Sequence, residues 1–137
     1  PRARALTVER DLRCVVTENA AVSCWRDFRS APTTVGGLAG VSSVAVMDST
    51  VCAVVSTGVR CSRELRASGQ HAGWSLTFPV PESQNFRTII GGPSHMCAHD
   101  NVRLAWCWGS NVRGELGDGT DVSRTTPVRV LAPANPP

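Results

Sequence analysis

The amino-acid sequence predicts an all-β protein built from about three copies of one strand-rich unit. Six cysteines fall into three pairs of nearly equal spacing, short apolar β-forming runs flank each pair, and Gly- and Pro-rich segments separate the copies. The repeat period is 38 residues from Cys14 to Cys52 and 45 residues from Cys52 to Cys97. Units of about 40–50 residues with several short strands are typical of β-propeller blades.

Each cysteine pair is expected to close a β-hairpin. A Cys opens an apolar run, a short polar stretch follows, and an alternating segment leads to the second Cys. Opposed hairpin positions bring Cβ atoms within about 4.5–5.5 Å, which is close to the reach of a disulfide. We therefore predict three disulfides, with six free, buried cysteines as the alternative. The pairs are Cys14 with Cys24, Cys52 with Cys61, and Cys97 with Cys107.

The other elements follow from the same repeat. Hairpin turns are expected at 18–20, at 56–57 and around 101–103, and the last is the least typical because it lacks Gly. Apolar strands are expected at 41–47 and 87–92, and loop connections at 30–40 and 78–86. One partial propeller domain, 1–137, then divides into repeats at about 1–38, 39–85 and 86–132, with a Pro-rich tail at 133–137.

The stretch "HMCAHDNVRLAWCWGSNVRGELGDGTDVSRTTPVRV" at 95–130 resembles one repeat of the regulator of chromosome condensation family. That repeat combines a G-x-x-H motif, a hairpin, a W-G-x-N-x-x-G-Q-L-G-x-G-T segment and a closing P-x-x-V. The two-cysteine form is similar to the bacterial, often exported branch of the family. The structural positions of the motif are His95, Trp108, Gly109, Asn111, Gly114, Leu116, Gly117, Gly119 and Pro127.

The resemblance implies a four-stranded antiparallel sheet per blade, with the blades arranged radially. It is weaker in the earlier copies, where Ser62 stands in place of Trp and the segment 63–76 replaces the Gly-rich motif only loosely. Family members carry about seven blades, so three blades do not close a ring. In the third copy, the glycines after Trp108 are expected to supply positive φ or close backbone approach, and Trp108 itself to pack between blades.

Some residues have the chemistry of a metal site or a catalytic site, but their pattern favours neither. His95, Cys97 and His99 share one strand face and have donor atoms suited to zinc or copper. However, the resemblance makes His95 structural, and Cys97 is expected to pair with another cysteine. Ser94 lacks the second flanking Gly of a nucleophile elbow, and "DGTD" at 118–121 lacks the spacing of a calcium loop. We therefore expect no metal, no cofactor, no catalytic residue and no enzyme activity.

The charge pattern favours a protein partner over nucleic acid. The net charge is +3, and all 14 basic residues are Arg, scattered singly along the chain. Arg60, Arg63 and Arg66 could line a surface, although scattered Arg is more often simply solvated. No apolar stretch approaches the ~20 residues of a membrane span.

The function expected from these observations is a protein–protein interaction or scaffold module, exported and disulfide-stabilised, at an extracellular, cell-surface or periplasmic location. Its partners would be other protein chains or further blades of the same polypeptide, bound at residues that the sequence does not identify. One alternative is a structural subunit of a larger extracellular assembly. The resemblance adds binding of nucleic acid or a small GTPase, as in nuclear members, and it also implies varied partners, including an extracellular enzyme.

Overall fold

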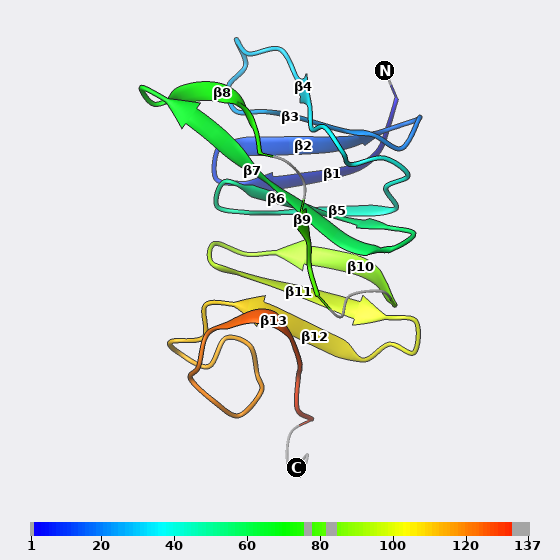
Figure 1. Ribbon diagram of the computed structural model, residues 1–137, viewed down its shortest axis with the longest axis vertical. Coiled ribbons are helices and arrows are strands. Elements are labelled where there is room, and N and C mark those ends of the chain that lie inside the picture. The colour runs from blue at the N-terminus through cyan, green and yellow to red at the C-terminus, as the bar shows by residue number, and fades with distance from the viewer. Residues whose placement is uncertain (1, 76–77, 82–84, 133–137) are drawn as a thin grey trace.

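The computed structural model describes residues 2–75, 78–81 and 85–132, and these residues form strands, turns and irregular segments. Three antiparallel sheets are stacked along the longest axis of the molecule (Figure 1). None of the described residues lies in a helix that is long and apolar enough to cross a membrane. The strands of the first sheet are β1 (Ala3–Glu9), β2 (Leu12–Thr17), β3 (Val22–Trp25) and β4 (Thr33–Thr34).

The second and third sheets repeat this order and confirm the predicted all-β fold class. The second sheet contains β5 (Ser43–Met47), β6 (Thr50–Val55), β7 (Gly58–Ala67) and β8 (Gln70–Trp74), with β9 (Phe78–Pro79) paired to β7. The third sheet contains β10 (Phe86–Gly91), β11 (His95–Asp100), β12 (Ala105–Gly109) and β13 (Arg124–Arg129). The Pro-rich tail at 133–137 lies outside the described residues.

The second sheet differs from its neighbours in having two strands beside β7. Cys61 of β7 lies opposite Phe78 of β9, just as Cys24 lies opposite Thr33 in the first sheet. Strand β9 is therefore the counterpart of the outer strands β4 and β13. Strand β8 belongs to an additional hairpin. In this hairpin β7 continues beyond the part that corresponds to β3 of the first sheet and β12 of the third.

The hairpin registers place the cysteines of each pair directly opposite one another, and the structure joins them by disulfides. The Cα atoms of each pair are 4.1 Å apart. This is close to the short spacing of non-hydrogen-bonded pairs in antiparallel ladders. All six cysteines of the sequence are bonded in this way.

The third hairpin turn forms without Gly because an aspartate holds it. Arg103 adopts a positive φ of 67°. The Asp100 carboxylate accepts hydrogen bonds from the backbone N–H groups of Val102, at 3.0 Å, and Leu104, at 2.9 Å. Its second oxygen accepts one from Nε1 of Trp106 at 3.0 Å. Partial burial tends to raise the pKa of Asp100, but these donors outweigh it and lower the pKa below the ordinary value.

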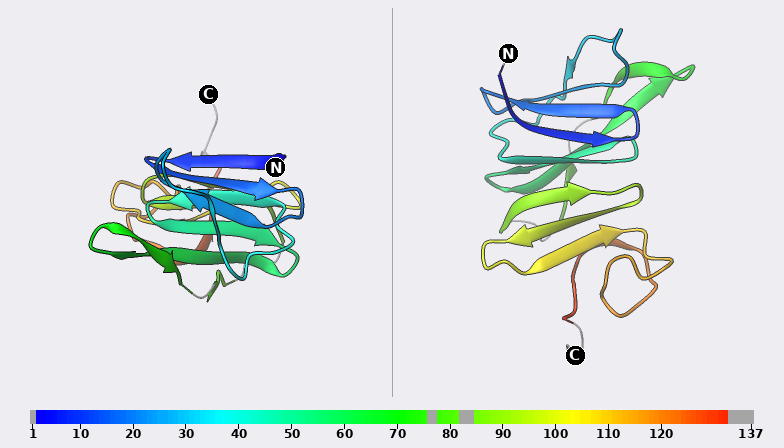
Figure 2. Two further views of the ribbon diagram at one scale, coloured as in Figure 1. Left: turned by 90° about the horizontal axis from the view of Figure 1, so that it is seen from above. Right: turned by 180° about the vertical axis from the view of Figure 1, so that it is seen from behind.

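The second sheet supplies one face to each of two hydrophobic cores. Because side chains alternate along a strand, Val44 and Val46 face the first sheet, whereas Ala45 faces the third. Strand β5 lies beside both β1 and β10, so the first strands of the three sheets are neighbours (Figure 2). Close approach is required here, since a Cβ on Gly91 of β10 would lie 2.0 Å from the carbonyl oxygen of Val46.

The Gly-rich segment after β12 is organised by one buried side chain. Nδ2 of Asn111 donates to Oδ1 of Asp118 at 3.1 Å and to the carbonyl oxygens of Thr120, at 3.0 Å, and Val122, at 3.1 Å. Its Oδ1 accepts a hydrogen bond from the backbone N–H of Leu116 at 2.9 Å. Positive φ values of 76°, 64° and 79° occur at Gly114, Gly117 and Gly119.

Trp108 connects the same segment to the core. Its side chain is buried between the second and third sheets and stacks on Phe86, with ring centroids 6.0 Å apart and an angle of 8° between the planes. Offset stacking of this kind adds to the stabilisation from apolar burial.

Candidate functional site: a cleft between the first and second sheets

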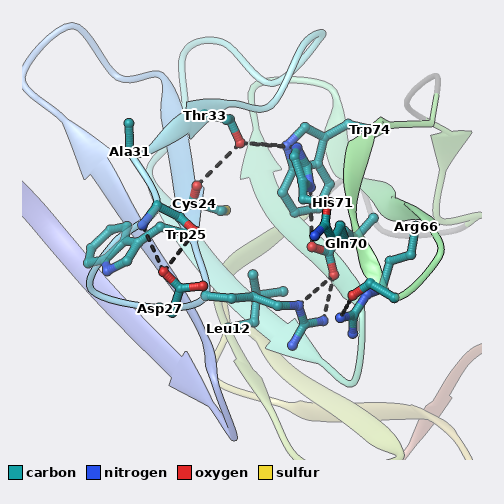
Figure 3. A pocket seen from close by; sticks show the side chains of 14 residues that line it. Leu12, Cys24, Trp25, Asp27, Ala31, Thr33, Arg66, Gln70, His71 and Trp74 are labelled. Carbon is teal, nitrogen blue, oxygen red and sulfur yellow. Dashed lines mark hydrogen bonds and ion pairs between the residues drawn. The ribbon is translucent and has the colours of Figure 1, made fainter.

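A cleft lies where the β7–β8 hairpin approaches the first sheet. It has a volume of about 390 Å³ and is shown in Figure 3. One wall is the end of β3, with Trp25, and the loop that follows it, with Asp27. The other wall is the hairpin, including His71 and Trp74. Segments from two different repeats therefore form the two walls.

The hairpin exists because of local turn chemistry and strand register. Ala67 lies opposite Gln70, so two residues, Ser68 and Gly69, form the turn. Both have positive φ, 51° and 77°, as expected for the tight turns that suit the twist of a hairpin. In the third repeat, the corresponding segment folds instead into the compact turn around Asn111.

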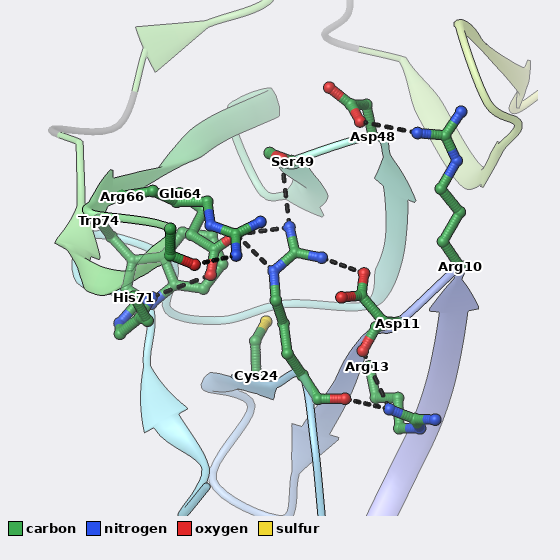
Figure 4. Close-up of polar contacts among 12 residues, drawn as sticks. Arg10, Asp11, Arg13, Cys24, Asp48, Ser49, Glu64, Arg66, His71 and Trp74 are labelled. Carbon is green, nitrogen blue, oxygen red and sulfur yellow. Dashed lines mark hydrogen bonds and ion pairs between the residues drawn. The ribbon is translucent and has the colours of Figure 1, made fainter.

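Glu64 of β7 is the centre of the cleft's polar network (Figure 4). Its side chain is only 1% exposed, and Arg26, just after β3, is 15% exposed. Nε and Nη2 of Arg26 donate to Oε2 of Glu64 at 2.8 Å and 2.5 Å. The same guanidinium also donates to the Asp11 carboxylate and, at 3.1 Å, to Oγ of Ser49. Arg26 thus connects the first sheet to two segments of the second.

The other oxygen of Glu64 holds the second strand of the hairpin. Nδ1 of His71 lies 3.2 Å from Oε1 of Glu64, and Nε2 of His71 lies 3.4 Å from Oγ1 of Thr33 in β4. Nε1 of Trp74 donates to the same Thr33 oxygen at 3.3 Å. The hairpin is therefore fastened to the first sheet at both of its strands.

The electrostatics of this network favour its charged form. Burial by itself would raise the pKa of Glu64, but the hydrogen bond and charge of Arg26, with help from His71, lower it below its ordinary value. The hydrogen bond from Arg26 to Glu64 raises the pKa of Arg26, against the opposing effect of burial. Both carboxylate oxygens are already occupied, so this arrangement suits structural support and binding rather than proton transfer.

Large apolar side chains are exposed near the cleft. Phe28, in the loop after β3, is 91% exposed, and Leu65, next to Glu64 on β7, is 46% exposed. The guanidinium of Arg29 lies 5.6 Å from the centre of the Phe28 ring. Neither Phe28 nor Leu65 lines the cleft, but exposed apolar and cationic groups beside a cleft have the character of a protein-binding surface.

The sequence-predicted metal candidates lie together on one face of β11, but one of them is already bonded. Cys97 forms a disulfide with Cys107, and Nδ1 of His95 is buried without a hydrogen-bond partner. Nδ1 of His99 lies 3.1 Å from the backbone oxygen of Asp100. Among the described residues, no group of three or more His, Cys, Asp or Glu side chains could hold a metal ion. The expected absence of metal stays a prediction.

Two of the three arginines singled out from the sequence line a common surface. Arg63 and Arg66 border an open depression of about 790 Å³ together with Arg10 and Ser94. Arg60 is not among the residues that line it. Asp118 of the "DGTD" turn holds Thr120 and Asn111, so it acts within the turn, and its pKa is lowered chiefly by the hydrogen bond from Thr120.

Sequence reasoning missed the residues that form the cleft, namely Arg26, Glu64, His71 and Trp74. The sequence feature that could have indicated them is the departure of segment 63–76 from the repeat motif. A hairpin in that segment, with Glu64 on the face directed towards the first sheet, was not expected.

Comparison with known proteins yields one family model and several solved structures. The model described as "Regulator of chromosome condensation (RCC1) repeat" matches residues 104–136. Human WBSCR16 has a TM-score of 0.73 and 19% identity, over 96% of this chain and 40% of that chain. Prp20p from Saccharomyces cerevisiae has a TM-score of 0.74 and 12% identity, over 96% and 39%. Among curated protein sequences, none matches this chain.

A further solved structure is yeast RCC1 (Prp20) bound to Kap60, with a TM-score of 0.72 and 13% identity, over 96% of this chain and 37% of that one. These matches confirm the resemblance: the chain carries an RCC1 repeat at its C-terminal end and has the fold of part of an RCC1-like β-propeller. The chain spans about 40% of the length of the solved proteins.

Proposed function

We propose that this chain is a protein–protein interaction module that binds its partner beside the β7–β8 hairpin. The observation that carries the proposal is the hairpin itself, which departs from the compact Gly-rich turn of the third repeat and is fastened to the first sheet through Glu64 and Trp74. The fastened hairpin and the neighbouring loop present Leu65 and Phe28 to solvent. Loops held on a rigid scaffold are common sites of recognition.

The similar solved proteins support a role in binding. The Prp20p structure is described together with binding to Gsp1p and histones, and the yeast RCC1 structure contains Kap60. These partners belong to those proteins, and for this chain we propose protein binding without naming the partner.

We further propose that the protein functions in an oxidising compartment: outside the cell, at its surface or in a periplasm. The three disulfides support this, because structural disulfides persist where thiol-reducing systems are absent. Recovery from a reducing cytosol with six free thiols would contradict it.

The binding proposal is tested by affinity capture from the natural environment, followed by identification of the bound proteins. Leu65→Asp and Phe28→Ser should each abolish capture of a protein that the unaltered chain retains, because both remove exposed apolar contacts. Val102→Ser is the matched control, since Val102 is 68% exposed but lies in the third hairpin turn, away from the cleft. Equal capture by all four proteins would exclude the hairpin surface.

A structural subunit of a larger assembly is the second candidate, and specific exposed residues favour it. Leu6 and Val8 are 63% and 54% exposed on β1, and Ile90 is 66% exposed on β10. They lie on the outward faces of the first and third sheets. Both faces of the second sheet, by contrast, pack against a neighbouring sheet. Further blades of the same polypeptide or another chain would cover the outward faces of the first and third sheets.

A further inference from the structure

The first two repeats place an arginine at the same position, two residues after the second cysteine of the hairpin. These arginines are Arg26 and Arg63. Arg63 lies opposite Thr50 of β6 in the ladder. Arg63 lines a groove together with Trp108 of the third sheet. In the same way, Arg26 of the first repeat contacts the second sheet through Glu64. Each arginine therefore lies at the boundary between its own sheet and the next.

The acidic partner that Arg26 finds in its own sheet is missing beside Arg63. Arg26 is paired with Asp11, which lies three residues before the first cysteine of its hairpin. The same position in the second repeat is occupied by Ser49. A neutral hydroxyl replaces a carboxylate.

The acidic partner from the following sheet is missing as well. Arg26 binds Glu64, which lies three residues after the second cysteine of the second hairpin. In the third hairpin that position is Ser110. Within the part of the chain that the structure describes, Arg63 takes part in no ion pair, although its repeat-equivalent has two.

The groove beside Arg63 is suited to an occupant with both apolar and anionic groups. It has a volume of about 390 Å³, and its walls include Met47, Val80 and Trp108. Arg124 also lines it, and Nε of this side chain is buried without a hydrogen-bond partner. Guanidinium groups bind carboxylates strongly when two parallel hydrogen bonds form.

Two acidic residues near the groove already have arginine partners, and one of these partners, Arg124, itself lines the groove. Asp48 lies 3.4 Å from Nη1 of Arg10, and Asp118 lies 3.5 Å from Nη2 of Arg124. Asp118 also accepts hydrogen bonds from within its own turn. These contacts leave the positive charge of Arg63 available to a partner.

We propose that the groove between the second and third sheets binds an acidic segment of a partner protein. A carboxylate of that segment takes the place beside Arg63 that Glu64 takes beside Arg26, and an adjacent apolar side chain packs against Met47 and Trp108. This inference rests on the proposed function as a protein-interaction module. It names the chemistry of the recognised segment and a second contact surface.

A phage-displayed library of random peptides, selected on the full chain under oxidising conditions, tests the proposal. Selected peptides should contain Glu or Asp beside an apolar residue. Arg63→Ala should weaken their binding by roughly 10–100-fold, the effect of losing a charge-assisted hydrogen bond. Arg87→Ala, which removes an exposed arginine of β10 outside the groove, should leave affinity unchanged.

A second variant, which adds a contact instead of removing one, separates an effect on binding from a loss of stability in Arg63→Ala. Ser110→Glu should rebuild the pair that Arg26 makes with Glu64, so it should raise the thermal midpoint and block peptide binding. Unchanged affinity in either Arg63→Ala or Ser110→Glu would overturn the proposal.

Two further outcomes separate this inference from the proposed function. If selected peptides lose affinity only in Leu65→Asp or Phe28→Ser, the groove assignment is wrong and the hairpin surface remains. Competition experiments test the carboxylate assignment. If inorganic phosphate or a single-stranded oligonucleotide displaces the bound acidic peptide as effectively as an excess of the same peptide, the site recognises phosphate, and the carboxylate assignment is wrong.

Discussion

The guanidinium of Arg26 and the carboxylate of Glu64 join two repeats across a sheet boundary, with Nε of Arg26 donating to Oε2 of Glu64 at 2.8 Å. The two residues are 38 positions apart in the chain. Neither is part of the repeat motif, yet together they hold the hairpin that forms one wall of the cleft. The pair therefore couples the stability of the molecule to the shape of its candidate binding surface.

Glu64→Ala should destabilise the protein by about 2–3 kcal/mol, because the largely buried Arg26 would lose its main partner. Urea unfolding followed by circular dichroism measures the effect. Asp121→Ala, an exposed carboxylate in the Gly-rich segment, serves as the control and should leave the unfolding midpoint unchanged. Equal midpoints for Glu64→Ala and the unaltered chain would show that the pair contributes nothing.

The same carboxylate should make stability depend on pH. Its pKa is lowered in the folded protein, so its contribution is fully present above the ordinary glutamate pKa and is lost as the pH falls through the lowered value. The difference in urea midpoint between the unaltered chain and Glu64→Gln should therefore shrink as the solution is acidified. A difference that grows in acid would contradict the lowered pKa.

Asn111→Ala should destabilise the Gly-rich segment strongly. The side chain is buried and makes several hydrogen bonds with Asp118, Leu116 and neighbouring backbone groups, so its loss leaves buried polar groups unsatisfied. We expect a cost of about 2–4 kcal/mol in urea unfolding. Asn101→Ala, in the exposed third hairpin turn, is the comparison and should change stability little.

The three disulfides should differ in their accessibility to reductant. The Cys14–Cys24 and Cys52–Cys61 bridges are buried between sheets, whereas Cys97 lies half-buried on the outward face of the third sheet. Limited treatment with a mild thiol, followed by alkylation and peptide mass mapping, should label Cys97 and Cys107 first. Native protein alkylated without reductant should carry no label, and labelling of all six cysteines there would refute the pairing.

The chain of residues 1–137 should associate when produced alone under oxidising conditions. Its end sheets leave Leu6, Val8 and Ile90 exposed, and apolar sheet faces favour association. Light scattering should detect oligomers, and Leu6→Glu combined with Ile90→Lys should reduce them. A monodisperse monomer that melts cooperatively would show that the arc is self-sufficient and would remove the case for an assembly subunit.

Much of the fold could be predicted because its determinants are local. The spacing of Cys14 and Cys24, with a three-residue turn between Thr17 and Ala21, is enough to place the two cysteines opposite each other. The same reasoning applies to the other hairpins. The Gly-rich motif of the third repeat needs positive φ at fixed positions, so its sequence also predicts its conformation.

The sequence by itself thus determined the all-β class, the hairpins with their cysteine partners, and the resemblance of the last repeat. Tertiary structure decided the identity of the outer strand in the second sheet and the meeting of Arg26 with Glu64. Among the residues that the structure describes, it also gave Arg63 no ion pair of the kind that Arg26 has. The physical reason is that these features join residues of different repeats. They depend on how one sheet packs against the next, and neither turn chemistry nor strand alternation contains that information.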